Sequence, residues 1–210
     1  MKKIALAMIM AGMLLVCSCA PKNENDNAVV SPDTEVSEAQ ISEEAVNDES
    51  EIVKILAGDV VDARTGEKVK VSELDYSEDA SIFPDRYCEV DLDGDGKNEY
   101  LIEYSTYGNT AIIHEYDGEL YAYVIPFRSR LELKTDGEMM WSEGAGYSGT
   151  HRAVFNGKKM EMTTLLDSDF DEDVHYINGE SVTFDEAIKA WDEFDSKKDA
   201  DWFFVYELYE

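Results

Sequence analysis

Acidic residues stand at alternate positions, 91, 93, 95 and again 99, of a short segment, DLDGDGKNEYLIEY, which begins at residue 91. The regularly spaced acids are Asp91, Asp93, Asp95 and Glu99. Gly94 and Gly96 allow the chain between them to turn. This spacing can curl the carboxylates and the backbone carbonyl of Lys97 around Ca²⁺, which takes about six to eight oxygen ligands at about 2.3–2.6 Å. The sequence therefore predicts a calcium site at residues 91–99, and a solvated acidic turn is the alternative.

The loop differs from an EF-hand. Its twelfth position is Ile102, where an EF-hand has a bidentate glutamate, and a strand pattern follows where an EF-hand has a helix. Without a cation, close carboxylates raise one another's pKa or push the loop open. A divalent ion removes this repulsion. We expect a modest calcium affinity, with a Kd of about 10⁻⁴ to 10⁻³ M, as in other extracellular modules.

Patterns that could indicate nucleotide binding or nucleophilic catalysis lie in unsuitable contexts. The segment GAGYSG, residues 144–149, fits a dinucleotide-binding fingerprint, but it lies between two strand patterns, so we predict a plain loop. Ser148 lacks a nucleophile elbow, because that motif requires glycine where Thr150 stands. The histidines show no zinc-ligand spacing and are His114, His151 and His175.

A pair of carboxylates acting as in glycosidases is the remaining catalytic alternative. No sequence pattern selects such a pair among the 47 acids. The region where we would place it is a groove near Trp141, Glu143 and Tyr147. We therefore expect a non-enzymatic protein, with a cell-wall or glycan hydrolase as the alternative.

The elements that must position these residues are predicted to be mainly strands. Turn dipeptides suited to tight hairpins recur about every 20 residues, at Asp117-Gly118, Asp136-Gly137, Asn156-Gly157 and Asn178-Gly179. Strands of about eight residues fit between them, and the segment VVDARTGEKVKV predicts a further hairpin at Thr65-Gly66. The predicted fold class is mainly β (α+β): an antiparallel β-meander of hairpins in a blade-like or curved sheet.

Two helical patterns flank the strands. Ile52, Val53, Ile55 and Leu56 predict a short N-terminal helix that ends at Gly58. The segment VTFDEAIKAWDEF predicts an amphipathic helix that covers a sheet face, with a capping box formed by Thr183 and Glu186. Its apolar face would consist of Phe184, Ala187, Ile188, Trp191 and Phe194. Residues 201–208 predict a last strand or apolar strap that packs in the core through Trp202, Phe204 and Tyr206.

The N-terminal segment carries a targeting signal. Two lysines precede an uninterrupted small and apolar run from Ile4 to Val16. This run is shorter than the roughly 20 residues that a membrane-spanning helix needs. The next residues, VCSCAPK, resemble a bacterial lipoprotein signal. That resemblance implies cleavage after Ser18, lipidation of Cys19 and a stable membrane anchor. The alternative is ordinary signal cleavage near Ala20.

An acidic tether is predicted between the signal and the folded domain. Residues 20–50 contain nine acids, one lysine and no aromatic residue, so they cannot bury enough surface to order themselves. We therefore divide the chain into a signal peptide at residues 1–18, a lipid-anchored disordered tether at 19–50 and one β-rich domain at 51–210. The formal charge of the whole chain is −29, which excludes binding to nucleic acid.

Cysteine use predicts a domain without an intramolecular disulfide. With Cys17 removed in the signal and Cys19 lipidated, Cys88 alone remains. Cys88 alternates with Tyr87 and Glu89, a pattern that indicates a buried thiol behaving as a small apolar side chain.

The acidic loop resembles the aspartate loop of integrin-type, FG-GAP or VCBS-like β-propeller blades, which lies directly before a strand. More broadly, the order of motifs from DARTGEKVKVSELDY to ADWFFV is similar to that of a group of exported lipoproteins from Clostridia-type bacteria, over about residues 51–206. The similarity implies a β fold and an extracytoplasmic, lipid-anchored location at the outer face of the bacterial membrane. It implies no particular reaction. We expect a monomer whose partner is a glycan, a peptide or an envelope protein.

Overall fold

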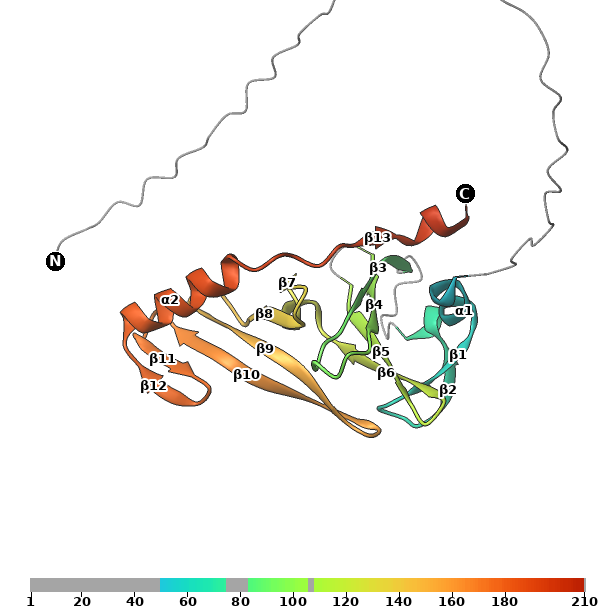
Figure 1. Cartoon of the computed structure of the whole chain (residues 1–210), viewed down its shortest axis with the longest axis horizontal. Coiled ribbons are helices and arrows are strands. Elements are labelled where there is room, and N and C mark those ends of the chain that lie inside the picture. The colour runs from blue at the N-terminus through green and yellow to red at the C-terminus, as the bar shows by residue number, and fades with distance from the viewer. Residues whose placement is uncertain (1–49, 75–82, 106–107, 210) are drawn as a thin grey trace, which may run out of the picture. The chain divides into compact units, whose positions relative to one another are not determined.

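The computed structural model describes residues 50–74, 83–105 and 108–209. The predicted signal peptide, Cys19 and nearly all of the predicted tether lie outside these residues. The described chain is mainly β, as predicted, and forms two sheets with two α-helices (Figure 1). Among the described residues, no helix has both the length and the apolar composition needed to cross a bilayer.

The first sheet has seven strands in the order β13-β3-β4-β5-β6-β1-β2. Their bounds are β1 (Asp59–Asp62), β2 (Lys68–Lys70), β3 (Pro84–Val90), β4 (Glu99–Tyr104), β5 (Thr110–Tyr116), β6 (Glu119–Ile125) and β13 (Phe203–Phe204). Strands β3 to β6 form the predicted antiparallel meander. The predicted hairpin β1–β2 adds to its edge through a parallel pairing of β1 with β6, which places Val61 beside Tyr121.

The second sheet has six strands in the order β12-β11-β10-β9-β8-β7. Their bounds are β7 (Glu132–Leu133), β8 (Glu138–Ser142), β9 (Tyr147–Asn156), β10 (Lys159–Asp169), β11 (Val174–Ile177) and β12 (Glu180–Val182). Each is antiparallel to the next in the chain. A 3₁₀ turn, η2 (Phe127–Ser129), separates the two meanders directly after Pro126, which cannot donate a backbone hydrogen bond to continue a ladder. The strands thus form two sheets, each built around a meander of hairpins of the predicted kind.

Tight turns join the strands where the sequence predicted them. Asp117 and Gly118 have φ angles of 54° and 74° between β5 and β6, and Asn178 and Gly179 have φ angles of 51° and 80° between β11 and β12. Two successive residues with positive φ match the right-handed twist of the strands that they connect. The short side chains of Asp and Asn tolerate this conformation better than bulkier residues do.

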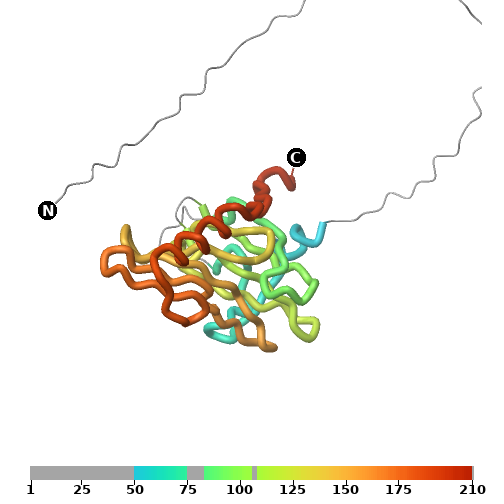
Figure 2. The backbone as a smooth tube through the Cα atoms, turned by 60° about the vertical axis from the view of Figure 1, so that its left-hand side comes forward, coloured from blue at the N-terminus to red at the C-terminus, as the bar shows by residue number. Residues whose placement is uncertain are grey.

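Both predicted helices are present. Helix α1 (Glu51–Ala57) ends before Gly58, where a Cβ atom would lie 2.8 Å from the carbonyl oxygen of Lys54. Helix α2 (Phe184–Asp195) begins with the predicted capping box and packs on β10 and β11 (Figures 1 and 2). Ala187 and Phe194 are buried, and Phe184, which is 48% exposed, packs against His175 of β11 with ring centroids 5.6 Å apart, so all three lie on the face that covers the sheet, as predicted.

The C-terminal segment differs from its predicted packing. Its strand is restricted to β13, which pairs with the edge of β3, and a 3₁₀ helix, η3 (Val205–Tyr209), follows. Trp202 packs against the core as predicted. Phe204 and Tyr206 are 41% and 57% exposed and stack on each other with ring centroids 5.3 Å apart, so their predicted place in the core is wrong.

Apolar side chains form two buried clusters. One joins the sheets and includes Cys88, Leu101, Met139 and Ala153. The other lies on the opposite face of the first sheet, where α1 and a 3₁₀ turn, η1 (Val71–Glu73), contribute to it. Full burial of one large aliphatic side chain stabilises a fold by about 1.5–3 kcal/mol. Cys88 is fully buried, as predicted, and this burial raises the pKa of its thiol to about 12.

Candidate functional site

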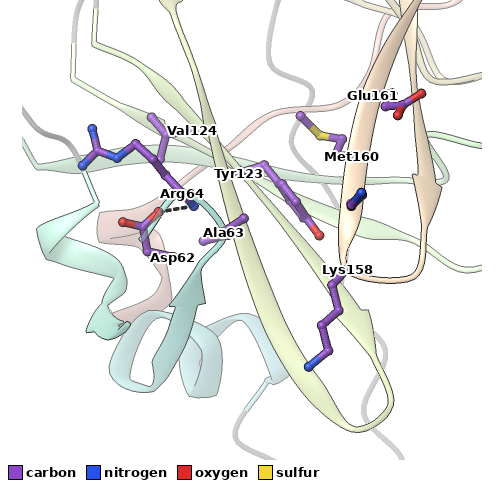
Figure 3. A pocket seen from close by; sticks show the side chains of 10 residues that line it. Asp62, Ala63, Arg64, Tyr123, Val124, Lys158, Met160 and Glu161 are labelled. Carbon is purple, nitrogen blue, oxygen red and sulfur yellow. Dashed lines mark hydrogen bonds between the residues drawn. The ribbon is translucent and has the colours of Figure 1, made fainter. Parts of the chain in front are cut away.

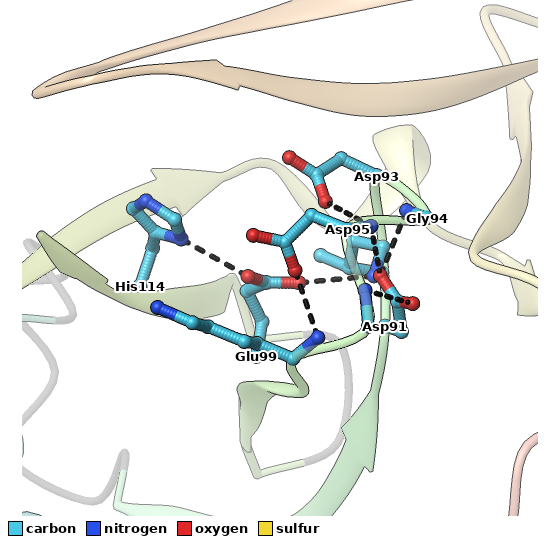
Figure 4. Close-up of polar contacts among 9 residues, drawn as sticks. Asp91, Asp93, Gly94, Asp95, Glu99 and His114 are labelled. Carbon is cyan, nitrogen blue, oxygen red and sulfur yellow. Dashed lines mark hydrogen bonds and ion pairs between the residues drawn. The ribbon is translucent and has the colours of Figure 1, made fainter.

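The predicted calcium loop connects β3 to β4, and its backbone folds around one aspartate (Figure 4). The carboxylate of Asp91 accepts hydrogen bonds from the N–H groups of Gly94, Asp95 and Gly96, at 2.7, 3.1 and 2.9 Å. Gly94 and Gly96 have φ angles of 81° and 89°, a region that side chains with a Cβ atom rarely adopt. The two glycines therefore let three successive N–H donors reach Asp91.

The other acids of the loop take different places. Asp93 accepts the N–H of Asp95 at 3.1 Å, and Asp95 accepts the N–H of Lys97 at 2.8 Å. Glu99 begins β4, is 2% exposed and accepts the N–H of Leu92 at 2.9 Å. Carboxylate oxygens of Asp91, Asp93 and Glu99 lie within 4.8 Å of one another. The structure thus gathers three of the four acids, and the carboxylate of Asp95 is outside that group.

A histidine that the sequence did not connect to the loop contacts its most buried acid. Nδ1 of His114, on β5, lies 3.0 Å from a carboxylate oxygen of Glu99, and the His114 ring stacks on Phe155 with centroids 4.0 Å apart. Burial raises the pKa of Glu99, and the hydrogen bonds from Leu92 and His114 partly oppose that shift. The pairing of β4 with β5 brings the two residues together, and no local sequence signal indicates it.

The second sheet also contacts the loop. The turn between β7 and β8 places Gly137 so close that a Cβ atom there would lie 2.6 Å from the carbonyl oxygen of Leu92 and 2.8 Å from that of Asp91. Gly137 has a φ angle of 82°, so glycine satisfies both the backbone angle and the close approach. The loop backbone is therefore held by a turn of the other sheet as well as by its own hydrogen bonds.

Three converging carboxylates could share a hard cation. Two oxygens bound to the same Ca²⁺ at about 2.3–2.6 Å can be no further apart than about 5 Å. The 4.8 Å limit for Asp91, Asp93 and Glu99 meets this condition. Ionised carboxylates at this separation repel one another, and a divalent cation would reverse that repulsion.

A groove on the second sheet contains the residues named for the hydrolase alternative. Trp141, Glu143 and Tyr147 line one cavity of about 640 Å³, together with Arg128, His151 and Asp167. We call it the Trp141 groove. Trp141 is on β8, Tyr147 and His151 are on β9, and Asp167 is on β10. The sequence indicated neither Asp167 nor Arg128, because strand register places Asp167 on β10 near Trp141, and the fold of the η2 turn places Arg128 there.

The glycine-rich segment was predicted to be a loop; residues 144–146 lie in the β8–β9 connection as predicted, whereas residues 147–149 begin β9, so the prediction is wrong for them. It precedes a strand and therefore offers no helix N-terminus for a pyrophosphate. Ser148 pairs with Ser142 and Ser168 in the sheet ladders. Nε2 of His151 lies 2.8 Å from the carbonyl oxygen of Ser129, and because a carbonyl oxygen can only accept, Nε2 carries the proton and donates this hydrogen bond.

A smaller cavity of about 370 Å³ lies where the first sheet approaches the β9–β10 hairpin (Figure 3). Asp62 at the end of β1 accepts hydrogen bonds from the N–H of Arg64 and the hydroxyl of Thr65, both at 2.9 Å. Lys158 lies on the opposite side and contacts the ring face of Tyr121 at 5.0 Å. The buried hydroxyl of Tyr123 has no hydrogen-bond partner among the described residues.

Comparisons of this chain with protein-family models, with curated proteins and with solved structures find no match in any of the three.

Proposed function

We propose that this chain is an exported, lipid-anchored and calcium-binding β-rich module that serves a binding or structural role at the bacterial cell envelope. Calcium would bind the loop at residues 91–99, with Asp91, Asp93, Asp95 and Glu99 as carboxylate ligands and Lys97 as a carbonyl ligand. The cation would hold the acidic end of the β3–β4 hairpin together.

The observation that carries this proposal is the convergence of Asp91, Asp93 and Glu99 within 4.8 Å. Asp91 fixes the loop through three backbone N–H groups, so the loop is already folded back on itself. Glu99 is buried, and its carboxylate would gain from a neighbouring positive charge because burial alone disfavours its ionised form. The described residues contain Cys88 as their one cysteine, so a bound cation would supply the cross-link that disulfides supply in many exported domains.

The proposed location depends on the first 50 residues. The lysines, the apolar run and the cysteine at position 19 support export and lipidation of Cys19. The acidic segment that follows supports a tether between the membrane and the domain. We propose a monomer that touches the membrane through its lipid anchor alone and meets a glycan, a peptide or an envelope protein.

Thermal unfolding of the purified protein tests the calcium site. With a Kd of about 10⁻⁴ M, calcium at about 100 times that concentration adds roughly 2.7 kcal/mol to the free energy of unfolding. For a domain of this size, that gain should raise Tm by about 5–10 °C relative to chelator. The variant Asp93→Asn should melt at one temperature in both conditions, because it removes a ligand charge while keeping the side-chain shape.

A matched variant, Asp192→Asn, controls for the general loss of one acid. Asp192 is an exposed residue of α2, so its replacement should leave the calcium response intact. Magnesium should replace calcium poorly, because it requires shorter bonds and keeps its own waters. Identical melting curves of the unaltered protein in calcium and in chelator would remove calcium from the proposal.

The hydrolase alternative is favoured by one observation, the presence of Glu143 and Asp167 in the Trp141 groove. Two carboxylates across a groove are what glycoside hydrolysis requires. If the alternative holds, cell-wall or glycan fragments should be cleaved by the protein and left intact by the Glu143→Gln variant. Binding without cleavage would favour the non-enzymatic role.

A further inference from the structure

The Trp141 groove is a concave surface built on regular strands. Its volume, about 640 Å³, falls within the range of about 300–1,000 Å³ that is typical of small-molecule sites. Most of its side chains come from three adjacent antiparallel strands, β8, β9 and β10, whereas Arg128 belongs to the η2 turn and Glu143 to the β8–β9 connection. Side chains on paired strands are held more rigidly than those on loops, so the part of the groove formed by Trp141, Tyr147 and Asp167 is largely preformed.

Two aromatic rings form an ordered pair in the groove. Trp141 and Tyr147 meet edge to face, with centroids 5.1 Å apart and an interplanar angle of 77°. The indole lies against Gly149, where a Cβ atom would approach its Cζ2 atom to 2.8 Å. Both aromatic residues are half-buried, so part of each remains accessible. A glycine on β9 thus makes room for a flat aromatic surface on the sheet.

Polar groups surround these rings, and hydrogen bonds hold several of them. The hydroxyl of Tyr147 donates to Asp167 at 3.4 Å. His151 binds the carbonyl oxygen of Ser129 through Nε2 at 2.8 Å, and burial lowers the pKa of His151, so its ring is neutral and Nδ1 is an acceptor. Arg128 and Glu143 are exposed residues that line the same groove. The groove therefore offers donors and acceptors beside an aromatic surface.

This combination matches the chemistry of a sugar. One face of a pyranose ring presents C–H bonds, which carry partial positive charge and are attracted to the electron-rich face of an indole. Its hydroxyl groups both donate and accept, so they can satisfy carboxylates, a guanidinium and a neutral histidine at once. A purely apolar ligand would leave those polar groups desolvated and unpaired.

Charge selects among sugars. The chain has a formal charge of −29, and the groove itself contains Glu143 and Asp167 against one cation, Arg128. An anionic polysaccharide would be repelled by this field. We propose that the Trp141 groove binds a short, uncharged oligosaccharide, with Trp141 as the stacking surface and Glu143, Asp167, Arg128 and His151 as hydrogen-bond partners. This inference deepens the proposed binding role and rests on it.

Isothermal titration of the purified protein with tetrasaccharides and one tetrapeptide of defined charge tests the groove. The uncharged probes are chitotetraose, cellotetraose, xylotetraose and maltotetraose, and tetragalacturonate and tetralysine are the anionic and cationic probes. We expect saturable binding of at least one uncharged probe and no binding of tetragalacturonate, whereas any attraction of tetralysine to the acidic protein should be unaffected by Trp141→Ala. Trp141→Ala should weaken binding of the uncharged probe at least about tenfold, because aromatic side chains at the centre of a site carry much of the affinity.

Further variants separate loss of the site from loss of the fold. Arg128→Ala removes an exposed side chain and should weaken binding severalfold while leaving Tm unchanged. Trp191→Phe alters a tryptophan of α2 outside the groove and should bind as the unaltered protein does. Tryptophan emission should shift with the uncharged probe in Trp191→Phe and lose most of that shift in Trp141→Phe.

The proposal is overturned if no uncharged probe binds, if only tetralysine or tetragalacturonate binds, or if Trp141→Ala and Arg128→Ala bind as tightly as the unaltered protein. Cleavage of a bound probe would support the same ligand class and would assign a hydrolase activity to the groove. Because the calcium proposal is read from Tm in chelator, its failure is distinguishable from failure of the oligosaccharide titration.

Discussion

Replacement of Glu103 is expected to destabilise the fold strongly, because it would leave the buried positive charge of Arg130 without its partner. Glu103 on β4 is 7% exposed, and its carboxylate forms an ion pair with the guanidinium of Arg130, which is 4% exposed. Arg130 also donates through Nε to the buried hydroxyl of Thr110 at 3.0 Å. A second guanidinium, that of Arg86, lies 2.6 Å from the other carboxylate oxygen of Glu103.

Two independent considerations give the size of the effect for Glu103→Leu. Opposite unit charges about 4 Å apart attract by about 4 kcal/mol at the effective dielectric constant of about 20 that suits protein sites. Removal of one member of a buried ion pair costs about 3–5 kcal/mol, since the other charge stays desolvated. Arg86 adds little, because its side chain is 36% exposed and can regain water. We therefore expect a loss of about 3–5 kcal/mol in the free energy of unfolding.

Urea denaturation followed by tryptophan fluorescence measures this loss. For a slope of about 2 kcal/mol per molar urea, the midpoint of Glu103→Leu should fall by about 2 M. Arg130→Met should also destabilise the fold, but by less, because Arg86 still pairs with the other carboxylate oxygen of Glu103. The double variant should lose less than either single one, because paired apolar side chains replace a buried ion pair at little cost. Its remaining loss, about 1–3 kcal/mol, would come from the unpaired hydroxyl of Thr110.

A solvent-exposed ion pair of the same protein serves as the control. Lys198 and Asp201 approach to 2.8 Å, with side chains 68% and 69% exposed. Asp201→Asn should cost less than about 1 kcal/mol. A loss in Glu103→Leu no larger than that control would refute the argument from burial. Losses that simply add in the double variant would also refute it, because coupled charges cannot contribute independently.

Two further predictions concern the Trp141 groove. Gly149→Ala would place a Cβ atom 2.1 Å from the carbonyl oxygen of Leu166, so we expect urea denaturation to report a loss of about 1–3 kcal/mol in the free energy of unfolding. In the control, Gly144→Ala, the added Cβ atom meets no atom within 4 Å, so its free energy of unfolding should lie within about 0.5 kcal/mol of that of the unaltered protein. Equal losses in the two variants would contradict this reasoning. Burial lowers the pKa of His151, so the unfolded chain binds that proton more readily, and the stability due to neutral His151 should be present above about pH 6.5 and decline as the pH falls below it. Between pH 7 and 5, His151→Gln should therefore lose less unfolding free energy than the unaltered protein, and parallel pH profiles would exclude a contribution from His151.

Local sequence features were sufficient to predict most of the elements. Hairpins depend on turn residues and on the alternation of the flanking strands, all within about 20 residues, so Asp117-Gly118 and Asn178-Gly179 indicated their turns correctly. Helix α2 was predictable for the same reason, since Thr183 and Glu186 form its capping box within one turn. The spacing of the acids in residues 91–99 likewise directed attention to one loop.

Contacts between distant segments were not predictable in this way. Phe204 and Tyr206 are exposed, although the apolar composition of their segment suggested a core. The division into two sheets, and the parallel pairing of β1 with β6, depend on which faces bury the most apolar surface. The burial of apolar surface is non-directional and is spread over many side chains, so no short sequence pattern predicts how the sheets will pair.

The sequence by itself determined the chemistry available to this protein: a cluster of carboxylates in a turning chain, a buried thiol, and aromatic residues among acids. Tertiary structure decided which of these groups meet. It brought His114 to Glu99 and Gly137 to the backbone of Leu92, and it assembled the Trp141 groove from three strands and a turn. The physical reason is that residue type sets what an atom can donate, accept or coordinate, whereas strand register and the packing of one sheet on another set the distances over which it can do so.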